Sequence, residues 1–128
     1  MKRVTGIGGI FFKAKDPAAL RAWYRTHLGI DAEEWGGKPF AWSGPDNPQG
    51  VGTTIWSVFN PDSTYLGASE RGFMINYRVA DLQDLVKALR AEGCKVDEKT
   101  EESEFGKFGW VTDPEGNRIE LWEPPPGK

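Results

Sequence analysis

The sequence has one cysteine and one histidine, and it lacks both a long apolar run and a run of positive charge. Cys94 alone cannot form an internal disulfide bond. No apolar stretch approaches the roughly 18 residues that a membrane-spanning helix needs, and no apolar signal segment opens the chain. The net charge is −3, so nucleic acid is not an expected partner. We therefore expect a cytoplasmic protein that binds neither membranes nor nucleic acids.

The composition otherwise suits one domain over residues 1–128. A chain of 128 residues is long enough to bury roughly two-thirds of its unfolded surface. The 16 glycines and 9 prolines favour many turns, as a sheet-rich fold requires.

The chain contains two similar halves. Residues 4–56 align with residues 69–122 at an offset of about 65. FFKAKDPAAL (11–20) aligns with NYRVADLQDL (76–85), and TIW (54–56) aligns with ELW (120–122). Few letters are identical, so the shared order of features carries the comparison. Such self-similarity is typical of a repeat architecture.

Each half is predicted to begin with a strand and a helix. Asp16 and Pro17 form an N-cap and a first helical residue, a combination that favours a helix start. Asp81 is the corresponding N-cap in the second half. Apolar residues then recur at helical spacing until Gly29 and Gly93, which predict the helix ends.

The rest of each half is predicted to consist of strands and turns. The expected strands cover 7–15, 39–43 and 51–59 in the first half, and 72–80, 95–100, 107–112 and 118–122 in the second. We expect unit one over about 4–59, unit two over about 72–123 and a tail over 124–128. A linker over about 60–71 leaves room for one more short strand.

Three segments give the chain a resemblance to a known superfamily. They are KDPAALRAWYRTHLGI (15–30), YRVADLQDLVKALRAEG (77–93) and DPEGNRIELWE (113–123). The sequence resembles the vicinal oxygen chelate superfamily, which includes glyoxalase I, bleomycin resistance proteins, fosfomycin resistance enzymes and extradiol dioxygenases. The resemblance implies an α+β fold in which two βαβββ repeats form an incomplete barrel that holds its ligand on the concave side. It implies no single reaction, because this scaffold hosts many chemistries.

The resemblance also implies four metal-ligand positions, one on the first strand and one on the last strand of each unit. They fall on Gly9, Thr54, Met74 and Glu120. Glycine has no ligating side chain, a thioether is soft and a neutral hydroxyl is a poor ligand, whereas zinc sites need about three protein ligands. The one histidine, His27, is expected in the last turn of the first helix. The superfamily permits a divalent metal, but we expect neither a metal site nor another cofactor.

Strand side chains alternate, so residues on the same face as these four positions are candidates for a ligand-binding cleft. The predicted ligand-binding residues are Phe11, Lys13, Thr54, Trp56, Met74, Asn76, Arg78, Arg118 and Trp122. A few polar groups within an aromatic wall are typical of a small-molecule pocket. The opposite face, which includes Ile55, is expected to pack under the helices.

Glu120 is the candidate catalytic residue, and two interpretations of it stay open. It could act as a general acid/base with its pKa tuned by the apolar wall. Alternatively, an ion pair with Lys13 or Arg78 would only satisfy a partly buried charge.

Three functions follow from these expectations, and whether the protein is an enzyme is left open. The first is a protein like the bleomycin resistance proteins, which binds a small, partly aromatic molecule in an aromatic cleft without the family metal. The second is a metal-free enzyme that uses Glu120 as acid/base. The third is a metal-dependent lyase or dioxygenase of the glyoxalase type. The superfamily resemblance and the symmetry of the repeat lead us to expect a homodimer.

Overall fold

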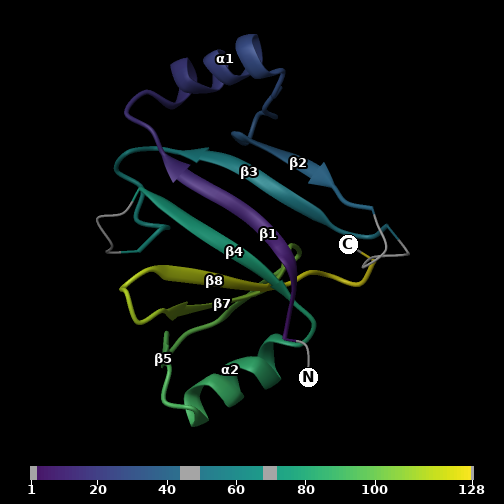
Figure 1. Cartoon of the computed structure of the whole chain (residues 1–128), viewed down its shortest axis with the longest axis vertical. Coiled ribbons are helices and arrows are strands. Elements are labelled where there is room, and N and C mark those ends of the chain that lie inside the picture. Colours follow the sequence, from purple (N-terminus) through teal and green to yellow (C-terminus); the bar gives the residue numbers. More distant parts are fainter. Residues whose placement is uncertain (1–2, 44–49, 68–71, 128) are drawn as a thin grey trace.

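The computed structural model describes residues 3–43, 50–67 and 72–127. Within them, two helices lie at opposite ends of the view in Figure 1, with the strands between them. Neither of these helices is long and apolar enough to cross a membrane. In chain order the elements are β1 (Val4–Lys13), α1 (Pro17–Leu28), β2 (Gly37–Ala41), β3 (Thr53–Phe59), β4 (Phe73–Val79), α2 (Leu82–Ala91), β5 (Lys95–Val96), β6 (Glu101–Ser103), β7 (Gly106–Thr112) and β8 (Arg118–Glu123).

Both helices start where the sequence predicted. The side chain of Asp16 accepts a hydrogen bond from the backbone N–H of Ala19 at 3.1 Å, and that of Asp81 accepts one from Asp84 at 3.0 Å. Each bond satisfies a donor of the first helical turn that has no partner within the helix. Gly29 ends α1 in the left-handed conformation, with φ of 70°, as expected for a C-terminal glycine.

The eight strands form one open sheet in the order β2-β3-β1-β4-β8-β7-β5, with β6 paired to β7. Within each half, the first strand pairs in parallel with the last, β1 with β3 and β4 with β8. The antiparallel pair of β1 and β4 joins the two halves. The predicted α+β fold, an incomplete barrel built from two related units, is confirmed.

Among the described residues, the first unit has one strand fewer than the βαβββ repeat that the resemblance implies. Between α1 and β2 the described residues form no strand, so this unit shows the order βαββ. Here the backbone N–H of Glu33 donates to Gly37 O at 2.8 Å, and that of Gly36 donates to Glu33 O at 2.9 Å. The segment therefore closes on itself in a turn, and its backbone groups are not free to pair with the sheet.

The structure also describes the predicted strand over 95–100 and part of the predicted linker. Of the strand expected over 95–100, only Lys95–Val96 form a strand (β5), and β6 begins just after it, at Glu101; the two pair with different parts of β7. Residues 60–67 of the expected linker form turns, in which Ser63 N–H donates to Asn60 O at 3.1 Å. The rest of that linker, residues 68–71, lies outside the described residues.

One face of the sheet packs against the helices, and we call it the helix face. Under α2 this packing forms the main apolar core. Under α1 it is aromatic, since Phe12 of β1 lies against Tyr24 of the helix with ring centroids 6.3 Å apart. The core residues under α2 are Val79, Leu82, Leu85, Val86, Val111 and Leu121.

The opposite face, which we call the inner face, carries a second apolar cluster. Side chains alternate between the two faces along a strand. The inner face therefore carries Phe11, Met74 and Trp110, each of which stands an odd number of residues from a helix-face side chain of the same strand. Leu66 of the connector between β3 and β4 completes this cluster and is only 1% exposed. The connector (residues 60–67) therefore covers part of the inner face.

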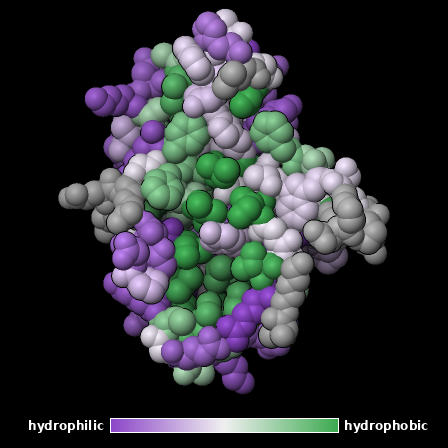
Figure 2. All heavy atoms as spheres, in the orientation of Figure 1, coloured by the Kyte–Doolittle hydropathy of each residue, from purple (hydrophilic) through white to green (hydrophobic). Residues whose placement is uncertain are grey.

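Apolar side chains are also exposed between the helices. Figure 2 shows hydrophobic residues gathered across the middle of the molecule, with hydrophilic residues around the rim. Ile7 and Ile10 of β1 and Phe73 of β4 are each at least 40% exposed. Exposed apolar groups on neighbouring strands form a surface suited to protein contacts.

Gly8 of β1 leaves room for side chains of β4 and β8. A Cβ atom at Gly8 would lie 2.0 Å from Oδ1 of Asn76 and 3.1 Å from the Trp122 ring, whereas one at Gly72 would meet nothing within 4 Å. We predict that Gly8→Ala lowers the free energy of unfolding by about 1–3 kcal/mol through overpacking. The matched Gly72→Ala should be neutral or stabilising by at most about 1 kcal/mol. Chemical denaturation of both variants measures the difference, and equal effects would contradict the close approach at Gly8.

Candidate ligand-binding site around Glu120

Glu120 of β8 is 1% exposed and accepts three hydrogen bonds. Its Oε2 accepts from the Tyr65 hydroxyl at 2.5 Å and from Nε1 of Trp110 at 3.0 Å. Its Oε1 accepts from Nδ2 of Asn76 at 2.6 Å. The register explains this convergence, because Asn76 of β4 and Trp110 of β7 lie directly opposite Glu120 on the two strands that flank β8.

Burial and hydrogen bonding act on this carboxyl in opposite directions. Burial raises the pKa of Glu120, while the hydrogen bonds from Tyr65, Asn76 and Trp110 and the charge of Arg118 lower it. The net pKa lies above the ordinary value of 4.5. Burial, with the adjacent carboxylate, also raises the pKa of the Tyr65 hydroxyl. That hydroxyl therefore remains a donor to Glu120.

Aromatic side chains surround this polar cluster. The Tyr65 ring stacks on Phe59 with centroids 5.7 Å apart and an interplanar angle of 16°. It also meets Trp110 edge-on, with a centroid distance of 6.4 Å and an angle of 86°. Offset stacking and edge contacts are the arrangements that aromatic rings prefer. The phenol thus lies in a slot formed by Phe59, Trp110 and Glu120, which we call the aryl slot.

Asn76 has an acceptor that the protein leaves unused. The residue is 3% exposed, and its Oδ1 has no hydrogen-bond partner within the described part of the chain. The atom faces Gly8, where a side chain would collide with it. Buried acceptors without a partner are uncommon in folded proteins.

A cationic and aromatic group lies next to Asn76 on the same face. The guanidinium carbon of Arg78 lies 5.2 Å from the Trp42 ring centroid and 6.0 Å from that of Trp122. Trp122 stacks in turn on Phe108, with centroids 6.3 Å apart. Burial lowers the pKa of Arg78. Stacking on two indoles offsets part of the cost of burying this cation.

Arg118 fixes the connector to the sheet. Its Nη1 donates to the backbone oxygen of Tyr65 at 2.9 Å, and its Nη2 pairs with Asp97 at 2.7 Å. The guanidinium carbon also lies 5.1 Å from the centroid of the Trp110 ring. Arg118 therefore supports the aryl slot from outside and holds the backbone that carries Tyr65.

The structure brings most of the predicted inner-face residues together. Met74 is fully buried with Phe11, and Asn76, Arg78, Arg118 and Trp122 surround Glu120 or its neighbours. Lys13 lies farther along β1, opposite Phe59. An ion pair of Glu120 with Lys13 or Arg78 was one interpretation of the sequence. In the structure, three uncharged donors bind the carboxylate instead.

The predicted orientation of β3 is wrong. Trp56 contacts Phe12 and Tyr24, with centroids 5.6 Å and 5.0 Å away, so it lies under α1. Ile55, which was expected there, packs against the cluster of the inner face. The hydroxyl of Thr54 donates to the Ile7 carbonyl at 2.5 Å and accepts from Trp42 Nε1 at 2.9 Å. Trp56 therefore does not line the face that carries Glu120.

A slip in the repeat alignment explains the error. Phe11 and Asn76 are equivalent, because each stands five residues before the N-cap of its helix. Phe11 pairs with Ser57, and Asn76 pairs with Glu120. The equivalent of Glu120 is therefore Ser57, three residues beyond Thr54. An odd slip reverses every side chain of a strand.

The residues at the family's metal positions do not fit a metal ion. The corrected set is Gly9, Ser57, Met74 and Glu120, which supplies a single carboxylate. Both oxygens of that carboxylate accept from N–H or O–H donors, which a metal would have to displace. Within the described ranges, no three His, Cys, Asp or Glu side chains gather in a way that could hold a metal. Hard and borderline cations need more ligands than this.

Sequence reasoning missed the contribution of Tyr65, Leu66 and Phe59. Phe59 follows from the corrected alternation of β3, since it shares a face with Ile55 and Ser57. Trp110 lies on the same face of β7 as Phe108, two residues away. Tyr65 and Leu66 lie in turns, where no periodicity indicates the direction of a side chain.

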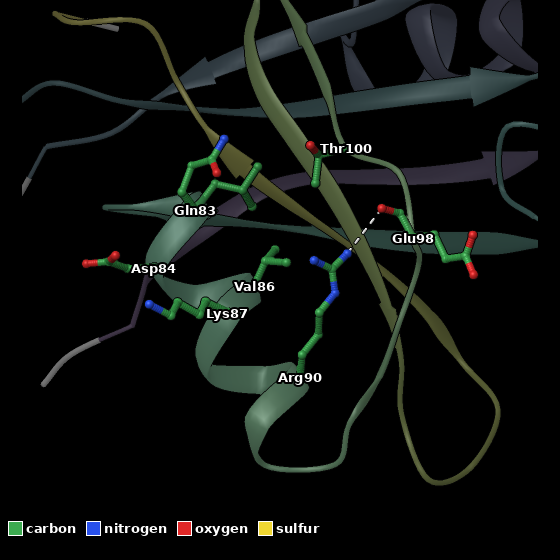
Figure 3. A pocket seen from close by; sticks show the side chains of 8 residues that line it. Gln83, Asp84, Val86, Lys87, Arg90, Glu98 and Thr100 are labelled. Atoms are coloured by element: carbon green, nitrogen blue, oxygen red, sulfur yellow. Dashed lines mark hydrogen bonds between the residues drawn. The ribbon is translucent and has the colours of Figure 1, made fainter.

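A surface hollow lies elsewhere, between α2 and the segment before β6. Figure 3 shows Gln83, Lys87 and Arg90 of α2 around it, with Thr100 on the other side. Arg90 donates to the backbone oxygens of Asp97 and Glu98 at 2.9 Å and 3.2 Å. These bonds fasten the segment to the helix, and the hollow is separate from Glu120.

Residues 9–122 match the family described as Glyoxalase-like domain. The chain belongs to this family. It is thereby a member of the vicinal oxygen chelate superfamily, as the sequence motifs had indicated. No curated protein matches the sequence significantly.

Solved structures agree with this glyoxalase-like assignment. A methylmalonyl-CoA epimerase in complex with methylmalonyl-CoA and NH4+ superposes with a TM-score of 0.71 at 17% identity, over 98% of each chain. The methylmalonyl-CoA epimerase from Mycobacterium tuberculosis gives 0.63 at 22% identity, over 96% of this chain and 90% of that one. An NAD-dependent benzaldehyde dehydrogenase structure from Legionella pneumophila gives 0.62 at 12% identity, over 91% and 98%. At these identities the likeness shows the fold.

The raised pKa of Glu120 predicts a specific pH dependence. An acid with a raised pKa in the folded state binds more protons folded than unfolded, so stability falls as pH rises from about 4.5 through the folded pKa. We expect the stability of the wild type relative to Glu120→Gln to decrease over that range. Denaturant titrations at several pH values measure this difference. As a control, Glu104→Gln, at an exposed position, should show the same dependence of stability on pH as the wild type. A stability of the wild type relative to Glu120→Gln that increases with pH would contradict the raised pKa.

Proposed function

We propose that this glyoxalase-like protein binds a small, partly aromatic molecule on its inner face, with Glu120 as the hydrogen-bond acceptor and without a metal. The observation that carries the proposal is the convergence of Tyr65, Asn76 and Trp110 on one buried carboxylate. Sites for small molecules combine a mainly apolar wall with a few fixed polar groups, and this face has that composition.

The unused oxygen of Asn76 adds support. It lies on the same face as Glu120 and next to the stacked Arg78 and Trp122. A ligand donor that reached this oxygen would remove the cost of a buried acceptor without a partner. The face therefore offers hydrogen bonds that the protein alone does not complete.

Catalysis by Glu120 is the second candidate function. Its raised pKa favours a role as general acid/base, since catalytic carboxyls are tuned in this direction by burial. Against it, both oxygens already accept from protein donors, and a general base must lie within about 2.6–3.2 Å of the proton that it takes. The third candidate, a metal-dependent lyase or dioxygenase, is supported by family membership but not by the ligand set.

We predict that a panel of small aromatic compounds contains members that raise the melting temperature and quench tryptophan fluorescence. Trp110→Phe should remove part of the quench, and Trp56→Phe, on the helix face, should leave it unchanged. Glu120→Gln should weaken binding about 10- to 150-fold, the loss of a hydrogen bond to a charged group. Affinity independent of Glu120 would contradict the proposal. Conversion of a bound compound would favour the enzyme, and about one metal ion per chain by elemental analysis would favour the metal-dependent function.

The proposal includes a homodimer that acts in the cytoplasm. Its support is the exposed apolar strip of Ile7, Ile10 and Phe73 on the two central strands. Ile10 pairs with Ile75 in the antiparallel ladder of β1 and β4, so the strip lies where the two units meet. Light scattering should give twice the monomer mass at micromolar concentration. Ile10→Lys should give the monomer mass, whereas Phe105→Lys, in the turn between β6 and β7, should keep the dimer. A monomeric wild type would contradict this part.

A further inference from the structure

Tyr65 lies on the inner face as a bound ligand would. Its ring runs from the surface, where the residue is 38% exposed, to a hydroxyl that meets the buried Glu120. Phe59 covers one side of the ring and Trp110 borders its edge. All the contacts of a small phenol in a protein site are thus made by a side chain of the protein itself.

We propose that the ligand of this site is a small aromatic ring carrying a hydroxyl or amino donor, and that it binds by replacing the Tyr65 side chain in the aryl slot. The inference rests on the proposed function and adds the chemical class of the ligand. Phe59 supplies the stacking surface, Trp110 the edge contact and Glu120 the acceptor.

The acceptor decides the class of ligand. Oε2 of Glu120 can bind a donor, as it binds the Tyr65 hydroxyl, and it repels an acceptor or an anion. A phenol or an aryl amine therefore fits, whereas an aromatic carboxylate does not. A ring without a donor would fill the slot but leave Glu120 one hydrogen bond short, and a buried charged group loses strongly by that.

The connector allows the exchange without unfolding the sheet. Arg118 holds the Tyr65 backbone at its carbonyl oxygen, and the buried Leu66 anchors the next residue. The Tyr65 side chain can therefore leave by rotation while its backbone stays in place. The Tyr65 side chain competes with a free ligand for the slot. The affinity of the wild type for that ligand is therefore the affinity of an empty slot multiplied by the fraction of wild-type molecules in which the slot is open.

The test uses p-cresol, which is the Tyr65 side chain as a free molecule, and toluene, which lacks only the hydroxyl. Calorimetry and thermal shift are measured on the wild type, Tyr65→Phe and Tyr65→Ala. We expect p-cresol to bind most tightly to Tyr65→Ala, less tightly to Tyr65→Phe and least tightly to the wild type. In Tyr65→Ala, p-cresol should bind at least about tenfold more tightly than toluene. Adding Glu120→Gln should reduce that preference to about threefold or less.

Tyr65→Phe keeps the ring, so it carries the test if Tyr65→Ala does not fold. Equal p-cresol affinity in Tyr65→Phe and the wild type would overturn the replacement of Tyr65. Equal affinity of p-cresol and toluene in the folded Tyr65 variants would overturn the assigned ligand class. In either case, a screened compound whose binding depends on Glu120 would leave the proposed function standing. If no compound depends on Glu120, the proposed function fails with the inference.

Discussion

The inner face is organised by one constraint, the burial of the Glu120 carboxylate. A carboxylate removed from water is costly unless donors replace its hydration. Here one donor comes from β4, one from β7 and one from the connector, so three parts of the chain meet at one side chain. The two strand donors follow from the register, since both lie opposite Glu120. The third determines where the connector lies.

The position of the connector has a cost and a consequence. Tyr65 and Leu66 cover apolar surface that would otherwise face water, which stabilises the fold by roughly 25 cal/mol per Å² buried. The same side chains occupy the space that a ligand of this face would need. Stability and access to Glu120 therefore oppose each other here. Arg118 sets the balance, because it holds the connector backbone and leaves the Tyr65 side chain attached only through its ring contacts and hydroxyl.

The sequence predicted the helix starts and the inner-face position of Asn76 and Glu120, because caps and strand alternation are local properties. It failed where the argument needed a non-local register. Aligning TIW with ELW made Thr54 the repeat equivalent of Glu120, whereas the strand pairing makes Ser57 the equivalent. That slip turned Trp56 to the wrong face. The role of Tyr65 was beyond such reasoning for a different reason. A residue in a turn has no periodicity, and the direction of its side chain is fixed by its contacts with Glu120, Phe59 and Trp110.

The corrected register also shows how two related units give one site. Phe11 is equivalent to Asn76, and Ser57 is equivalent to Glu120, so the first unit presents an aromatic ring and a small hydroxyl where the second presents an amide and a carboxylate. In the second unit, Asn76 donates a hydrogen bond to Glu120. In the first unit, neither Phe11 nor Ser57 carries a charged group. Phe11 instead joins Met74, Leu66 and Trp110 in the apolar cluster beside the carboxylate. The first unit thus adds an apolar ring to the cluster beside the carboxylate, and the burial of that carboxylate raises its pKa. The divergence of the two units therefore leaves Glu120 as the one buried carboxylate among the residues that the structure describes.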